Sequence, residues 1–456
     1  MRSNAQPDTA RGEFSSRFGF LMAASGSAVG LGNIWGFPTN TASNGGAAFL
    51  FTYVLLAFAL AYPALMAELI IGRHAKANAV TALRLISRGP ISYRLGTAVG
   101  FAGIVTVALI LSFYAIVSGW MMAFLLAAIS SLLGFETFTA WLRTDSLPRN
   151  TLFTAAFMML TIFVISAGVR NGIEKWASRL MPSLVVLLVL LIAYVLTLDG
   201  AMAGLRAYLV PDFSRVLDPG LLISAMGQAF FSLSLGVGTM LIYGSYISKK
   251  ENLPALGGMV ALLDIGIAFT AGLLILPAMY VALANGVAIY DDAGGLIAGP
   301  GLIIAVLPEL FDRMGSIGIL VTFAFFALMT IASLTSSISM LEVPVAYSVE
   351  NRGMARRKAT YLIGGIIMVI ALIIAANFDR LFDLVVTLTT EFSQPLLGLF
   401  FAVFIAWIWH RNAVLAEIRQ GFPEAGNSIF WRIWPFYIKF ICPLAIIAIY
   451  LQMLFF

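Results

Sequence analysis

Eleven long apolar stretches constrain this chain more than any other feature of its sequence. An α-helix needs about 20 apolar residues to cross the hydrocarbon core of a bilayer. Only 11% of the 456 residues are charged, whereas a soluble domain has about a quarter. An all-α integral membrane protein is therefore predicted, with spans at 17–38, 47–72, 96–129, 151–169, 175–198, 221–247, 255–285, 316–349, 359–377, 381–410 and 431–455.

The positions of Lys and Arg predict the orientation of these spans. With the N-terminus in the cytoplasm, twenty of the 27 Lys and Arg residues fall in cytoplasmic segments, six fall in outer segments, and Lys439 lies in the last span. Because cytoplasmic loops are enriched in these residues, we expect a multi-pass protein of the plasma (inner) membrane. Its N-terminus is expected to be cytoplasmic and its C-terminus outside. The same bias explains the net charge of +5 without a nucleic-acid partner.

The few cysteines and histidines exclude several kinds of chemistry. Cys442 is the only cysteine, so the chain has no internal disulfide, and we expect this residue to be packed within the last span. His74 and His410 are expected to be solvated at cytoplasmic helix ends. No paired nucleophile and base is evident, so an enzyme is not expected.

Two connecting segments are expected to be ordered. Residues 73–95 are predicted to include an amphipathic helix on the membrane surface, because apolar residues recur there at roughly helical spacing. Residues 286–315 are predicted to form a folded hairpin, or two short helices, over the outer face.

Two of the predicted spans carry glycine-rich interruptions. GSAVGLGNIWGFP (26–38) interrupts the first span, and SLSLGVG (232–238) interrupts the sixth. A broken helix frees backbone carbonyl and N–H groups, which lipid tolerates only where they line a cavity or hold a ligand. Interruptions at matching positions of two halves indicate a transporter with inverted repeats, in which freed carbonyls bind a cation and helix N-termini bind a carboxylate. Close packing of small residues is the alternative explanation.

Two carboxylates are also predicted to lie within spans. Asp264 is mid-span in ALLDIGIAF, and Glu68 lies near the inner end of the second span. A carboxylate inside a membrane is a candidate functional residue by default.

Several motifs, taken in order, resemble the neurotransmitter:sodium symporter family, in its short bacterial branch with eleven transmembrane helices. They are GSAVGLGNIWGFP (26–38), NGGAAF (44–49), AELIIGR (67–73), GQAFFSLSLGVG (227–238) and SLTSSIS (333–339). The resemblance implies a five-plus-five inverted-repeat fold with the first and sixth spans unwound. It also implies Na⁺-coupled uptake of amino acids or related amines. The chain would be one transporter domain, 1–456, with a first repeat at 17–198, an inverted second repeat at 221–410 and an extra span at 431–455.

The resemblance also implies two Na⁺ sites and a substrate site. Sodium site 1 would use Ala28, Asn33, Ser232 and Asp264. Sodium site 2 would use Gly26, Val29, Ala332, Thr335 and Ser336. The amino-acid substrate would contact Ala28, Leu31, Gly32, Ile110, Tyr114, Phe231, Ser232, Ser234, Val237, Ser336 and Met340.

Two gates follow from the same resemblance. Phe231 would act as a lid over the substrate. Many relatives pair an Arg of the first span with an acidic residue of the tenth as an outer gate, but this chain has Gly36 at the Arg position, which leaves Asp383 without that partner. Arg11, Glu350 and Phe14 match the inner gate.

Two further departures concern anions and substrate size. Animal members have a neutral residue at the position of Asp264 and use chloride, so a fixed carboxylate there predicts chloride-independent transport. Val237 replaces a common aromatic residue, which favours a large apolar or aromatic substrate. A non-transporting amino-acid sensor and a proton-coupled carrier that uses Asp264 or Glu68 remain alternatives.

Overall fold

The computed structural model describes residues 12–44, 46–210, 213–216, 218–290, 296–297 and 301–455, and in these ranges it is helical apart from turns, loops and isolated β-bridge residues such as the pair Tyr290 and Leu296. Short 3₁₀ or π-helical segments are labelled η. The first half comprises α1 (Arg17–Ala28), η1 (Gly32–Gly36), α2 (Phe37–Ser43), α3 (Ala47–Leu56), η2 (Ala57–Ala61), α4 (Tyr62–Ala75), α5 (Ala79–Ile86), α6 (Pro90–Leu132), α7 (Glu136–Arg143), α8 (Leu147–Ser166), η3 (Val169–Glu174), α9 (Lys175–Val195) and α10 (Ala201–Leu209).

The second half continues in the same all-helical manner. It comprises η4 (Phe213–Arg215), α11 (Pro219–Ser232), α12 (Thr239–Ser245), α13 (Leu253–Ala284), η5 (Leu302–Val306), α15 (Leu307–Arg313), α16 (Ser316–Arg352), α17 (Arg356–Ala376), α18 (Phe378–Val386), η6 (Thr387–Ser393), α19 (Gln394–Val403), η7 (Phe404–Ile408), α20 (Arg411–Arg419), η8 (Pro423–Asn427), α21 (Ile429–Phe436), η9 (Tyr437–Ile441) and α22 (Cys442–Phe455).

The predicted spans correspond to these helices. Within the described ranges, nine helices are long and apolar enough to cross a membrane, and the bent pair formed by α1 and η1–α2 makes a tenth. The span predicted at 221–247 is divided between α11 and α12, and neither piece is long enough to count alone. Ten of the eleven predicted spans therefore correspond to helices that could cross a membrane, and the sixth is divided into two shorter helices.

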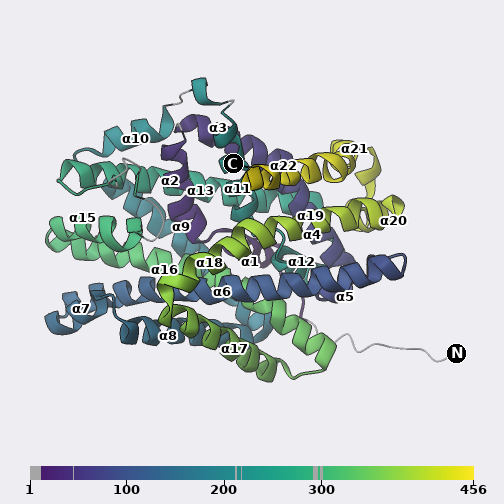
Figure 1. Cartoon of the computed structure of the whole chain (residues 1–456), viewed down its shortest axis with the longest axis horizontal. Coiled ribbons are helices and arrows are strands. Elements are labelled where there is room, and N and C mark those ends of the chain that lie inside the picture. The colour runs from purple at the N-terminus through teal and green to yellow at the C-terminus, as the bar shows by residue number, and fades with distance from the viewer. Residues whose placement is uncertain are drawn as a thin grey trace.

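The two longest helices, α6 and α16, lie along the same axis, which would be the membrane normal. α6 and α16 run lengthwise across Figure 1 and pack against each other. The 43 residues of α6 extend for about 65 Å, against a hydrocarbon core of about 30 Å. Its ends must therefore project from the core, and the short helices lie at those ends: α7 and α15 at the left of Figure 1, and α5 and α20 at the right.

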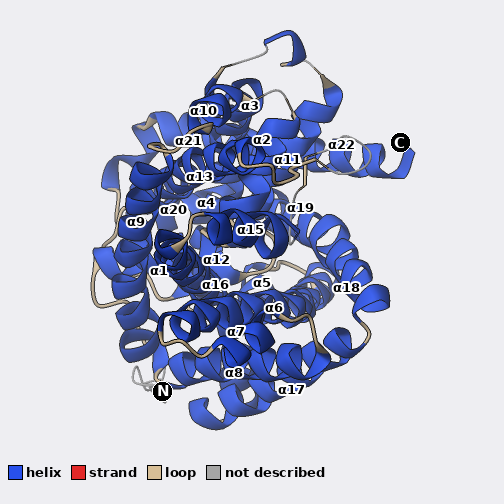
Figure 2. Ribbon diagram, turned by 90° about the vertical axis from the view of Figure 1, so that its left-hand side faces the viewer, coloured by secondary structure: helices blue, strands red, loops and turns tan. Residues whose placement is uncertain are grey.

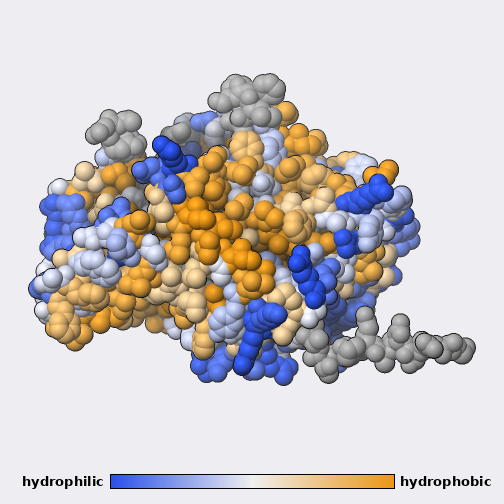
Figure 3. Space-filling view, turned by 60° about the horizontal axis from the view of Figure 1, so that its bottom comes forward, coloured by the Kyte–Doolittle hydropathy of each residue, from blue (hydrophilic) through white to orange (hydrophobic). Residues whose placement is uncertain are grey.

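One face of the helical bundle is largely apolar. Figure 3 shows hydrophobic residues over most of the middle of this face, with hydrophilic residues gathered at its left and right ends and along its lower edge. Figure 2, which looks toward one end of the bundle, shows helices surrounding the centrally placed α1, α12 and α16. Of these central helices, α1 carries Gly26 and Ala28, and α16 carries Thr335 and Ser336, all of which were predicted to form the binding sites.

Side-chain caps determine where several helices begin. Asn252 caps α13, because its Oδ1 accepts a hydrogen bond from the Ala255 N–H at 3.1 Å, and Ser16 caps α1 by accepting from the Gly19 N–H at 2.9 Å. Each cap satisfies a backbone donor that the first turn of a helix cannot pair.

The structure describes the first of the two connecting segments fully and the second in part. Residues 79–86 form the predicted amphipathic helix, α5, but its apolar face, including Val80, Leu83 and Ile86, is buried in the protein and α5 packs on α6. The prediction of a membrane-surface helix was wrong, because the protruding end of α6 offers an apolar surface within the protein. In 286–315 the described residues include an antiparallel bridge between Tyr290 and Leu296 and one short helix formed by η5 and α15.

Candidate functional site

Two interrupted spans meet at the centre of the protein. α1 ends at Ala28, and the chain resumes with the π-helical segment η1 after a bend of 71°. In the sixth span, residues 233–238 between α11 and α12 are not helical. Ser234, Gly236 and Gly238 have positive φ angles of 51°, 87° and 80°, which an α-helix does not contain. Both interruptions therefore free backbone groups in the interior of the bundle.

Glycines in the first span allow neighbouring side chains to approach its backbone. A Cβ atom added at Gly30 would lie 2.9 Å from both the Ser336 Oγ and the Tyr114 hydroxyl, and one at Gly32 would lie 2.5 Å from the Phe231 ring. Neither glycine has a positive φ angle, so the backbone conformation does not require glycine here. The requirement comes instead from the close packing of spans three, six and eight on the break.

A buried carboxylate holds the interrupted sixth span in place. The Glu68 side chain accepts hydrogen bonds from the N–H groups of Gly236 at 2.7 Å and Leu241 at 3.2 Å, and it is fully buried. Glu68 thus satisfies two backbone donors that the break leaves without helical partners. The sequence marked Glu68 as an intramembrane carboxylate but could not identify these partners.

Asp264 lies in a buried polar cluster with residues from both breaks. Asn33 donates through Nδ2 to Asp264 Oδ1 at 2.7 Å and to Ser232 Oγ at 2.9 Å, and Ser232 donates to Asp264 Oδ2 at 2.7 Å. Tyr53, which the sequence analysis missed, donates to Ser232 Oγ at 3.3 Å. All four residues are buried, so the cluster concentrates one carboxylate and several neutral oxygens beside the first break.

A second group of oxygens joins the first and eighth spans. Ser336 donates through Oγ to the carbonyls of Gly26 at 3.1 Å and Val29 at 3.2 Å. Thr335 donates to the carbonyl of Ala332 at 3.0 Å. The five residues predicted for the second sodium site therefore lie together, and carbonyl and hydroxyl oxygens are ligands that suit a hard cation.

Between the two groups lies a cavity of about 50 Å³. Ten of the predicted substrate residues line it, namely Ala28, Leu31, Gly32, Ile110, Tyr114, Phe231, Ser234, Val237, Ser336 and Met340. Ser232 does not line it, because its hydroxyl is directed into the Asp264 cluster. The Tyr114 hydroxyl accepts a hydrogen bond from the Leu31 N–H at 3.2 Å, and Ser234 donates to the Ser27 carbonyl at 3.0 Å.

Phe231 separates this cavity from two larger ones. It also lines cavities of about 230 Å³ and about 550 Å³, the second of which includes Asn40 and Glu391. The ring packs against Gly32 and is 40% exposed. Phe231 thus lies between the central cavity and the two larger cavities.

The predicted outer gate contains a residue that the sequence analysis did not single out. Gln228 accepts from Asn40 Nδ2 at 3.2 Å and donates to the Gly32 carbonyl at 3.4 Å, so it links the sixth span to the C-terminal half of the first span. Asp383 is exposed on α18, and Gly36 offers it no side chain. Gln228 lies within the motif GQAFF, so the sequence could have indicated this residue.

Two of the three residues predicted for the inner gate, Phe14 and Glu350, lie within the residues that the structure describes. Arg11 lies outside the described residues. Glu350 accepts hydrogen bonds from the backbone N–H and the Nδ2 of Asn78, both at 2.8 Å. Phe14 packs edge-to-face against Phe20, Tyr243 and Tyr246, so it joins the first and sixth spans at the same end of the molecule as α5.

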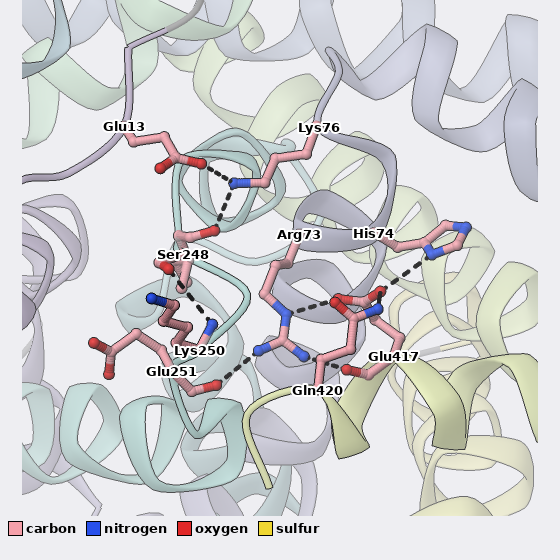
Figure 4. Close-up of polar contacts among 10 residues, drawn as sticks. Glu13, Arg73, His74, Lys76, Ser248, Lys250, Glu251, Glu417 and Gln420 are labelled. Carbon is pink, nitrogen blue, oxygen red and sulfur yellow. Dashed lines mark hydrogen bonds and ion pairs between the residues drawn. The ribbon is translucent and has the colours of Figure 1, made fainter. Parts of the chain in front are cut away.

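A buried ion pair fixes this end of the protein (Figure 4). Arg73 donates through Nε to Glu417 Oε1 at 2.7 Å and through Nη1 to the Glu251 carbonyl at 2.7 Å. His74 Nδ1 lies 3.3 Å from the other Glu417 oxygen, so the prediction that His74 is simply solvated was wrong. Cys442 is buried, as predicted.

The Glu417 carboxyl is held in its charged form. Burial alone would raise its pKa, but the hydrogen bond with His74 and the charge of Arg73 outweigh burial and lower the pKa below the ordinary value. The end of the second span is therefore tied to α20 by a charged contact at neutral pH.

Comparison with known proteins agrees with this architecture. The model of the Sodium:neurotransmitter symporter family matches residues 11–152 and 146–455. The chain is 34% identical to the uncharacterized sodium-dependent transporter YhdH of Bacillus subtilis (strain 168), over 97% of each chain. It is 30% identical to the sodium- and chloride-dependent taurine transporter of Bos taurus, over 67% of this chain and 55% of that protein.

A solved structure matches along nearly the whole chain. The structure described as MhsT in complex with L-phenylalanine superposes with a TM-score of 0.83 at 37% identity, covering 97% of this chain and 99% of that one. The all-helical membrane fold and the family predicted from the motifs are thereby confirmed, and members of this family are transporters and not enzymes. The chain belongs to the sodium:neurotransmitter symporter family.

Proposed function

We propose that this sodium-dependent symporter takes up an amino acid by alternating access. The observation that carries the proposal is the meeting of two broken spans at one cavity, with a buried carboxylate cluster on one side and a group of carbonyl and hydroxyl oxygens on the other. Carbonyls suit Na⁺, and N–H groups at the start of a half-helix suit a carboxylate.

Two Na⁺ ions are proposed as co-transported cargo. The first would bind at the Ala28 carbonyl with Asn33, Ser232 and Asp264, where the Asp264 carboxylate offsets the ion's charge. The second would bind between spans one and eight, at Gly26, Val29, Ala332, Thr335 and Ser336. Because the second site bridges two spans, its occupancy would favour one arrangement of them over another.

The substrate is proposed to be an amino acid with a large apolar or aromatic side chain. Its carboxylate would meet the backbone near Leu31 and Gly32 and the hydroxyl of Tyr114, and its amino group would meet the carbonyls of Ala28, Phe231 and Ser232. Its side chain would lie against Ile110, Val237 and Met340. The phenylalanine bound to MhsT, which this chain resembles over 97% of its length, supports the size of the side chain.

Transport is proposed to be independent of chloride. The taurine transporter that matches part of this chain is named as chloride-dependent, but here Asp264 supplies a fixed negative charge beside the proposed first ion.

The two repeats proposed to move against each other are 17–198 and 221–410. Phe231 and Gln228 would close the outer path, and Arg11, Phe14 and Glu350 would close the inner path.

The decisive experiment is uptake of radiolabelled amino acids into proteoliposomes. An inward Na⁺ gradient is compared with an equal K⁺ gradient, each with chloride or gluconate. We expect uptake of large apolar or aromatic amino acids that needs Na⁺ and is unchanged in gluconate. Uptake driven by a proton gradient in K⁺ would contradict Na⁺ coupling. Na⁺-dependent binding without uptake would indicate a sensor.

A further inference from the structure

A second cavity, of about 290 Å³, lies away from the transport site, between the end of span ten and span eleven. η7 and the start of α20 form one wall, and α21 and η9 form the other. Three cationic residues from three elements line it: Arg411, Arg432 and Lys439. No acidic residue lines it, and none of the three cations forms an ion pair with another described residue.

Aromatic rings hold two of these cations in place. The Arg411 guanidinium lies 5.5 Å from the centroid of the Trp431 ring, and the Lys439 ammonium lies 4.4 Å from that of Trp407. Trp431 is buried. Such contacts orient a cation without neutralising its charge, so the cavity keeps a concentrated positive charge.

The depth of Lys439 sets this cavity apart from an ordinary cluster of loop charges. Lys439 lies inside the span Ile429–Ala448, and it is seven residues after Arg432, about 10 Å along a helix. Helical side chains tilt toward the helix N-terminus, so the Lys439 side chain leans toward Arg432. Two cations thus meet from different depths at one cavity, an arrangement that membrane orientation alone does not require.

Beside the cations, the same elements offer an apolar surface. Phe436 is 55% exposed and Phe440 is 40% exposed, and both line the cavity. A ligand that matches this site has a phosphate group at the level of the arginines and hydrocarbon next to the two phenylalanines. We propose that the cavity binds the headgroup phosphate of an anionic phospholipid, with its acyl chains against Phe436 and Phe440.

The proposed orientation places this end of spans ten and eleven at the cytoplasm. The lipid would therefore belong to the cytoplasmic leaflet. Basic pockets between transmembrane helices on that side bind anionic headgroups, with about 1 kcal/mol for each Lys or Arg near the surface. A lipid held there would bridge spans ten and eleven. The site is independent of the proposed substrate, since it shares no residue with the central cavity.

Native mass spectrometry of the purified full-length protein tests this proposal. Phosphatidylglycerol and phosphatidylcholine are added at equal concentration, and we expect preferential retention of one phosphatidylglycerol. In Arg432→Gln/Lys439→Gln the affinity for phosphatidylglycerol should fall about fivefold for each cation removed. The matched variant Arg357→Gln/Lys358→Gln neutralises two exposed cations on α17 and should retain the lipid.

Three outcomes would overturn the proposal. They are equal retention of the two lipids, equal loss in both double variants, and displacement of the lipid by millimolar inorganic phosphate, which would indicate a site for a soluble anion. If the first double variant does not fold, the wild-type protein decides the question. Brominated phosphatidylglycerol should then quench tryptophan fluorescence more than brominated phosphatidylcholine, because Trp431 and Trp434 line the cavity, and equal quenching would refute the site.

Discussion

At the scale of single residues, Asp264 combines a large desolvation cost with several compensating contacts. Its two oxygens accept hydrogen bonds from Asn33 and Ser232 in a fully buried cluster. A carboxylate buried in a membrane protein is retained only where a cation or hydrogen-bond donors compensate for its lost hydration. In the proposed function, Na⁺ is that cation.

Replacing this carboxylate should weaken Na⁺ coupling. We expect Asp264→Asn to raise the Na⁺ concentration for half-maximal uptake by about tenfold or more, because a charged ligand contributes about 1.5–3 kcal/mol. Uptake by the variant should also become stimulated by chloride, which would supply the missing negative charge. Asp199→Asn, at an exposed position, is the control, and an unchanged Na⁺ dependence of Asp264→Asn would exclude Asp264 as an ion ligand.

Gly32 offers a second test at this scale. In Gly32→Ala the new Cβ would lie 2.5 Å from the Phe231 ring, so the ring must move away from the first break. Overpacking of this kind costs about 1–3 kcal/mol, and we expect substrate affinity in Na⁺ to fall about tenfold. Equilibrium binding of labelled substrate measures the effect. Gly365→Ala, with no atom within 4 Å of its added Cβ, should bind normally, and normal binding by Gly32→Ala would contradict a lid role for Phe231.

At the scale of elements, a buried ion pair links α4 and α20, two helices that are far apart in the sequence. Arg73 and Glu417 are both almost fully buried, and Arg73 also binds the carbonyls of Glu251 and Glu417. Removing one partner leaves the other charge buried without its counter-charge.

Glu417→Gln should therefore destabilise the protein, by about 3 kcal/mol. Unfolding in SDS, followed by tryptophan fluorescence, measures the free energy. Glu424→Gln, an exposed position nearby, should change it little. A similar stability of the two variants would mean that the ion pair contributes nothing.

The same pair predicts a dependence on pH. The pKa of Glu417 is lower in the folded protein than in the unfolded chain. The stability that the Glu417 charge contributes is therefore fully present at pH values above the ordinary carboxyl pKa, and it is lost as the pH falls through the lowered pKa. The stability difference between the wild type and Glu417→Gln should shrink below about pH 4.

The sequence predicted the elements of the site better than their partners. The two breaks follow from local glycine patterns, and apolar length predicts the spans, so both could be found without the structure. Glu417 lies 344 residues from Arg73, and Tyr53 approaches Ser232 from another helix. No local pattern specifies such contacts, because they depend on how the helices pack. His74 was misjudged for the same reason.

At the scale of the whole molecule, the proposed orientation can be tested with the chain's single cysteine. Cys442 is fully buried, so Cys442→Ser should give a functional background without thiols. In that background we expect Asp145→Cys to react with a membrane-impermeant maleimide in intact cells, and Lys249→Cys to react only after permeabilisation. Both positions are exposed, and the reverse pattern would invert the proposed topology.

The interrupted spans also have an evolutionary consequence. The groups that they free belong to the backbone, and a point mutation leaves backbone carbonyl and N–H groups in place. The cavity's other walls are side chains such as Ile110, Val237 and Met340, which mutation can exchange one at a time. Under the proposed function, a protein built in this way can change its cargo through its walls while keeping the backbone groups that bind the ions and the common amino-acid backbone, so new specificities can arise without a new means of energy coupling.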